Sequence, residues 1–123
     1  MYAFFSACPN YGSFIAWKRC GDKILKLKIP EDAERINVWN RECRANKALI
    51  LSIENEDGTD SNLKLVHSNF DYNFIYELNK MIVVEDYDNN PYEAATKGVH
   101  FWMTREEAVN YLKIRGNKNE CND

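Results

Sequence analysis

The chain has 123 residues, of which 45% are apolar and 13% aromatic, and its formal net charge is −3. This composition is typical of one folded domain and excludes an intrinsically disordered chain. The small net charge excludes a protein that holds bulk nucleic acid through charge alone.

The N-terminal segment MYAFFSA lacks the basic start and the long apolar run of a secretory signal. No stretch approaches the ~20 apolar residues of a membrane span. We therefore expect a cytoplasmic protein without membrane contact, in which the cysteines stay reduced. Neither the cysteines nor the two histidines show zinc-binding spacing, so no metal and no cofactor is predicted. These residues are Cys8, Cys20, Cys43, Cys121, His67 and His100.

Alternating apolar residues predict a β-hairpin in the first third of the chain. Residues 13–19 and 23–29 both alternate, and Gly21-Asp22 between them is a tight-turn signal. Cys8 and Cys20, on either side of the first strand, are interpreted as small apolar packing residues. Pro30 ends the second strand because it has no N–H, and the segment PEDAERI after it is predicted as a short helix or turn.

The rest of the chain alternates between strands and polar loops. Strands are predicted at 41–44, 47–55, 63–67, 74–78, 80–87 and 99–103. The irregular segment DNNPYEAATKG before the last strand is long for a compact domain, and loops of this size often border ligand sites. Thr104 begins a helix with a capping box, and Gly116 is a plausible stop. The prediction is a single α+β domain over 1–115, a mostly antiparallel sheet with a C-terminal helix, followed by a flexible tail at 116–123.

Four motifs, CPNYGSFIAWKRC, KLKIPEDAER, CRANKA and GVHFWMTREEAVNYL, occur in this order over most of residues 8–112. Together they resemble an uncharacterised domain of phage and bacterial proteins that is often found C-terminal to pentapeptide repeats. The resemblance implies a small phage-linked protein in a stand-alone version, without the repeats, and it implies no established chemistry. For a phage protein, the expected compartment is the cytoplasm of the host cell.

Charge and aromatic residues suggest where a ligand would bind. Residues 17–47 carry nine Lys and Arg but only five acids, so an anionic molecule would prefer this region. Tryptophans stand beside cationic side chains there and near His100, an arrangement that can stack a base and hold phosphates. The predicted ligand-binding residues are Trp17, Lys18, Arg44, His100 and Trp102. Trp17 and Lys18 are neighbours on one strand and point to opposite faces, which conflicts with both of them contacting one ligand.

Three functions stay open at this level. The favoured one is a non-catalytic binder that sequesters a nucleotide-like, phosphate-bearing signalling ligand and so counters a host defence. The second is an inhibitor that binds a host defence protein directly. The third is a nucleotide hydrolase or transferase that uses His100, although no catalytic motif supports it. Exposed sheet edges, including the apolar MIVV segment, also predict a homo-oligomer.

Overall fold

The computed structural model describes residues 8–9, 11–39, 42–67, 75–85, 87 and 98–115, with the backbone alone described at 38, 39 and 111–115. The predicted tail at 116–123 and nearly all of the segment 88–98 lie outside these ranges. In chain order the elements are β1 (Phe14–Cys20), β2 (Lys23–Ile29), β3 (Arg35–Trp39), β4 (Glu42–Ala45), β5 (Lys47–Asn55), β6 (Leu65–His67), β7 (Ile75–Glu77), β8 (Met81–Val83), β9 (Val99–Phe101) and α1 (Arg105–Arg115). The predicted fold class is confirmed: antiparallel sheets with one short C-terminal helix.

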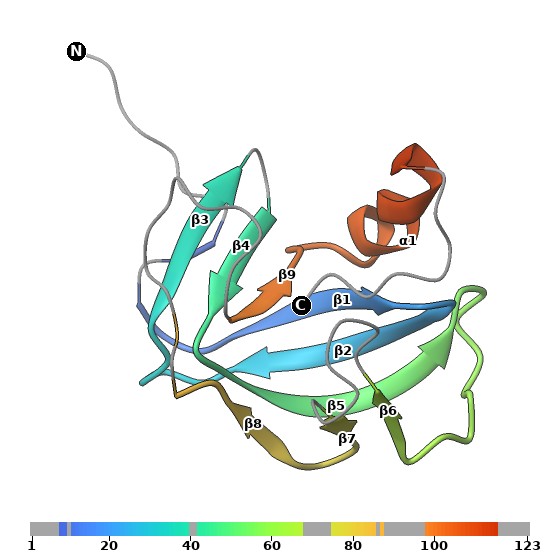
Figure 1. Ribbon diagram of the computed structural model, residues 1–123, viewed down its shortest axis with the longest axis horizontal. Helices are drawn as coiled ribbons and strands as arrows, with labels where there is room; N and C mark the ends of the chain where they lie inside the picture. The colour runs from blue at the N-terminus through green and yellow to red at the C-terminus, as the bar shows by residue number, and fades with distance from the viewer. Residues whose placement is uncertain are drawn as a thin grey trace.

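The largest sheet has the strand order β1-β2-β5-β8. The predicted hairpin forms it, with Cys20 opposite Lys23 and Phe14 opposite Ile29. Gly21 occupies the turn with a φ of 64°, a conformation that glycine adopts without a steric penalty. β5 continues the sheet beside β2, and β8 forms its last strand (Figure 1).

A second sheet has the order β3-β4-β9 and stands at a steep angle to the first (Figure 1). β4 and β5 are separated only by Asn46, so the chain passes from one sheet to the other at this bend. Asn46 is held from two sides: its N–H donates to the Glu34 carbonyl at 2.9 Å, and its own carbonyl accepts a hydrogen bond from Val84 at 2.8 Å. The bend therefore fixes how the two sheets meet.

The helix alternative for PEDAERI is wrong, and the turn alternative is confirmed. The chain turns at Glu31–Asp32, and β3 begins at Arg35. The Arg35 guanidinium holds this turn: it donates to the carbonyls of Pro30 at 2.9 Å, Glu31 at 3.1 Å and Ala33 at 3.0 Å.

The smallest sheet pairs β6 with β7, and both strands are shorter than predicted. α1 begins after Thr104, whose Oγ accepts a hydrogen bond from the Glu107 N–H at 3.2 Å, so the predicted cap is confirmed. The helix packs against β1 and β2. Two arginines attach it to the sheet and to the turn that follows β5. Arg105 donates to the Glu54 carboxylate at 3.0 Å, and Arg19 donates to the Val109 carbonyl at 2.8 Å.

The core lies between the sheets and under α1, and it is built mainly from small and aliphatic side chains. Leu25, Leu27 and Ile29 of β2 are fully buried, as their alternation predicts. Cys8, Cys20 and Cys43 are buried with them, which confirms that Cys8 and Cys20 act as packing residues. In the described part of the chain, no helix is both long and apolar enough to span a membrane.

We expect these three thiols to be unreactive in the native protein. A hydrogen bond with the Cys8 thiol, together with burial, raises the pKa of the Cys43 thiol far above its usual range. Thiolate is the reactive form, so a thiol-specific dye at neutral pH should label Cys8, Cys20 and Cys43 only after denaturation. Fast labelling of any of the three in the folded protein, located by peptide mass spectrometry, would show that this part of the core opens.

Candidate functional site

The structure brings the strand segments that carry the five predicted ligand-binding residues together where β1, β4 and β9 meet. Arg44 on β4 stands directly opposite His100 on β9. Trp17 and Trp102 exchange two backbone hydrogen bonds, of 2.8 and 2.7 Å, which join β1 to the end of β9. Lys18 follows on β1, and its ammonium donates to the His100 carbonyl at 3.3 Å. Residues more than 80 positions apart therefore form one group, which we call the cationic cluster.

The charged side chains of this cluster are buried. Lys18 and Arg44 are 0% exposed, and His100 is 4% exposed. The Lys18 ammonium also lies 5.4 Å from the centre of the Tyr76 ring, which gives it a second favourable contact. Burying a charge costs free energy unless partners replace the lost water, and these contacts supply part of that replacement. A ligand could reach these cations only if the surrounding segments moved.

His100 has a carboxylate neighbour that the sequence did not reveal. Its Nδ1 lies 3.5 Å from the Glu42 carboxylate, and both side chains are largely buried. A carboxylate beside an imidazole fixes the orientation of the ring. The pair has the elements of a general base, but with His100 almost fully covered it lacks an approach for substrate.

Gly98 and Tyr87 pack closely against Arg44 and hold it in place. Gly98 lies against its stem so closely that a Cβ at position 98 would be 2.4 Å from Cγ and 2.7 Å from Cδ of Arg44. The Tyr87 hydroxyl donates to the Arg44 carbonyl at 3.3 Å. The missing side chain of Gly98 thus provides the space that the arginine stem occupies.

Trp17 and Lys18 do not share an environment. Lys18 faces the interior, whereas Trp17 is only partly buried and has the Lys26 ammonium 5.7 Å from its ring centre. The two side chains therefore point to opposite faces of β1, as strand alternation predicts. Binding by the five predicted residues stays a prediction. The geometry gives Lys18, Arg44 and His100 a structural role at the junction of the sheets.

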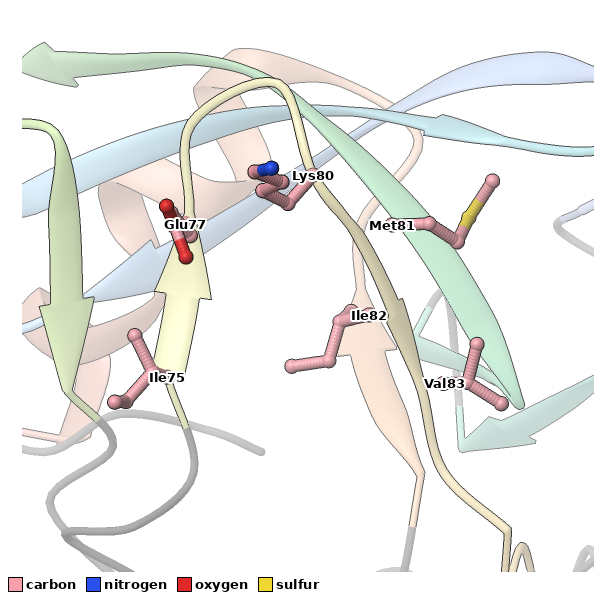
Figure 2. A pocket seen from close by; sticks show the side chains of 6 residues that line it. All are labelled: Ile75, Glu77, Lys80, Met81, Ile82 and Val83. Carbon is pink, nitrogen blue, oxygen red and sulfur yellow. The ribbon is translucent and has the colours of Figure 1, made fainter.

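A second feature lies at the opposite edge of the large sheet. A hollow of about 380 Å³ separates β7 from β8. In Figure 2, the side chains of Ile82 and Lys80 point into the space between the two strands, whereas those of Met81 and Val83 point away from β7. The hollow is lined by Ile75, Glu77, Lys80, Met81, Ile82 and Val83.

Exposed apolar side chains gather around this hollow. Among the described residues, five of the seven large apolar side chains that are exposed fall within residues 63–83. Val83 is 54% and Met81 46% exposed, although both belong to a strand. We call the group formed by Leu65, Ile75, Met81 and Val83 the β6–β8 surface. A concentration of apolar side chains of this kind is typical of a surface that binds another molecule.

Sequence reasoning noted the apolar MIVV segment as a sheet edge but did not place a site there. The missing information was that residues 75–77 come to lie beside β8. Within the described ranges, no three His, Cys, Asp or Glu side chains gather closely enough to hold a metal ion. The β6–β8 surface combines exposed apolar side chains with the charged residues Glu77 and Lys80, which line the hollow.

Comparison with known proteins adds a family but no activity. The model of a family of unknown function (DUF5758) matches residues 4–108, which is most of the chain. This agrees with the resemblance to an uncharacterised domain over residues 8–112. No curated protein and no solved structure gives a significant match.

Proposed function

Since the chain belongs to that family, whose function is not known, we propose a function from its own surface: it is a binding module that attaches to another protein through the β6–β8 surface. The observation that carries this proposal is the exposure of Met81 and Val83 on a strand beside a hollow. Removing such side chains from water is the main driving force of protein association, at about 25 cal/mol per Å² of apolar area.

The resemblance to a domain of phage and bacterial proteins suggests the class of partner. We propose that it is a host protein, whose activity in defence the module would block by occupying one of its surfaces. The mixed charges beside the hollow, Glu77 and Lys80, suit a protein surface better than a polyanion, because they do not favour one sign.

Site-specific photo-crosslinking in the producing cell tests this proposal. A photoreactive phenylalanine analogue at Val83 should form a covalent adduct with a protein partner, because the side chain is exposed and borders the hollow. The same analogue at Lys28 is the matched control: this position is also exposed on a strand of the same sheet but lies outside the β6–β8 surface.

The proposal requires an adduct from position 83 and none from position 28. It also requires that the adduct disappear when Met81 is replaced by lysine in the same chain. An absence of any adduct from position 83, or equal adducts from both positions, would contradict it.

Nucleotide binding is a second candidate, which the gathering of Lys18, Arg44 and His100 in one cluster favours. A phosphate could accept charge-assisted hydrogen bonds from these groups if the cluster opened. In this candidate the protein retains a nucleotide-like ligand unchanged, and the homo-oligomer predicted from the sequence would supply further walls of the site. A hydrolase or transferase that uses His100 would release a changed ligand.

We expect the two functions to separate in a retention assay. The protein is incubated with candidate cyclic nucleotides, freed of unbound ligand and heated, and the released material is identified by mass spectrometry. Under the nucleotide candidate, Arg44→Ala and His100→Ala should each weaken binding by ~1–3 kcal/mol, the range of hydrogen bonds to charged groups. Absence of any retained nucleotide in the wild-type protein would eliminate this candidate and leave the protein partner.

A further inference from the structure

The hydrogen bonds on either side of β8 determine which of its backbone groups face β5. Ile50 N–H donates to the Lys80 carbonyl at 3.1 Å, and Val84 N–H donates to the Asn46 carbonyl at 2.8 Å. In an antiparallel pair, the residues that bond to the partner strand alternate with residues that bond to the other side. The backbone groups of Ile82, the N–H of Val84 and the carbonyl of Lys80 therefore point toward β5, whereas the Lys80 N–H donates to the Glu77 carbonyl at 3.1 Å.

The backbone N–H and C=O groups of Met81 and Val83 consequently point away from β5. β8 is the last strand of its sheet, and among the described residues no further strand is paired on that side. The two residues are also the most exposed of the β6–β8 surface. The edge of β8 thus presents two N–H donors and two C=O acceptors in alternation.

The hollow lies beside β8 and is suited to the side chains of an added strand. β7 borders it on one side, and Ile82 reaches into it from β8 (Figure 2). Successive side chains of a strand point to opposite faces. In a strand paired with β8, alternate side chains would therefore lie on the face of Ile82, and the others on the face of Met81 and Val83.

From this arrangement we propose that the β6–β8 surface binds its partner by strand addition: an extended segment of the partner, apolar at alternate positions, pairs with the outer edge of β8. The inference rests on the proposed protein-binding function and adds its mode. The occupant follows from charge complementarity, because the alternating partial charges of N–H and C=O along the edge match the backbone of another extended chain. A folded helix or a small apolar molecule would leave these groups unpaired.

A selected peptide and amide exchange test the mode. A displayed library of random heptapeptides is selected on the full-length protein, and the most enriched peptide is synthesised as the probe. We expect apolar residues at alternate positions of the probe. Its binding should slow hydrogen exchange at the Met81 and Val83 amides, which face outward. The Ile82 amide, which faces β5, should exchange slowly with and without the probe.

Two variants at one position give the decisive comparison. Val83→Pro removes the outward N–H, and proline is tolerated at such positions of edge strands. It should weaken binding of the probe by about tenfold or more, the equivalent of one lost hydrogen bond. Val83→Ile keeps the branched apolar side chain and the N–H and should leave the affinity of the probe nearly unchanged.

Strand addition is overturned if Val83→Pro binds the probe as well as the wild type does, or if the probe protects neither Met81 nor Val83. Protection of these amides that rises with protein concentration in the absence of probe would also overturn it, by assigning the edge to a second copy of the chain. If position 83 still yields a protein adduct in cells while the probe test fails, protein binding by the β6–β8 surface is supported and only strand addition is contradicted. If the probe binds as expected but position 83 yields no adduct in cells, strand addition is supported and the proposed function is contradicted.

Discussion

Replacing Gly98 with alanine is expected to destabilise the fold by about 2–5 kcal/mol, the sum of backbone strain and overpacking. The φ of Gly98 is 147°, a conformation that residues with a Cβ rarely adopt. The new Cβ would lie 2.4 Å from Cγ of Arg44 and 3.1 Å from the Tyr87 ring. The Arg44 side chain is fully buried, so it has no space into which to withdraw.

Urea unfolding of the variant measures this effect, and Gly21→Ala is the matched control. Gly21 also has a positive φ, of 64°, but beyond its chain neighbours no atom lies within 4 Å of the position that a Cβ would occupy there. Its substitution should therefore cost only the backbone strain, about 1–2 kcal/mol. Equal destabilisation in the two variants would show that the contact with Arg44 is not a close one.

Replacing Arg19 with alanine is expected to cost about 3–5 kcal/mol, because it removes a large buried side chain together with its hydrogen bonds. The side chain is 1% exposed, yet it makes three directed contacts. It donates to the carbonyls of Gly21 at 3.0 Å and Val109 at 2.8 Å, and to the Glu56 carboxylate at 3.0 Å. Its loss therefore leaves unpaired acceptors and a cavity between β1 and α1.

The matched control is Arg105→Ala, which removes a guanidinium with a similar set of partners. Arg105 donates to Glu54, Asn55 and Glu56, but its side chain is more exposed, so water can replace these bonds. Thermal unfolding should show a clearly larger loss of stability for Arg19→Ala. The reverse order would mean that burial does not decide the strength of these contacts.

The elements that sequence predicted well are those governed by local rules. Alternation placed the hairpin of β1 and β2, and the predicted strand at 47–55 coincides with β5. Thr104 predicted the start of α1, because a cap depends on residues only three positions apart. By contrast, PEDAERI forms a turn followed by β3, and the segment is held by residues distant in the chain, since Arg35 donates to the Gly12 carbonyl and Asn46 donates to the Glu34 carbonyl.

For the candidate site, the sequence predicted which residues meet but not that they are buried. The aromatic and cationic residues chosen from the sequence do meet at the junction of β1, β4 and β9. Their burial could not be predicted, because it depends on segments that are distant in the chain, such as Gly98 against Arg44. Of the β6–β8 surface, only the apolar MIVV edge was noted from the sequence, because strands as short as β7 and β8 carry too few residues for alternation to assign their faces.

The central claim is that the β6–β8 surface, and not the cationic cluster, carries the binding function. Its most direct test is the affinity of the partner recovered by crosslinking, measured by calorimetry for the wild type and for Val83→Lys. A lysine at this exposed position should leave the fold intact and weaken binding by about 2–4 kcal/mol, as expected for a residue central to an interface. An unchanged affinity in the folded Val83→Lys variant would contradict the account.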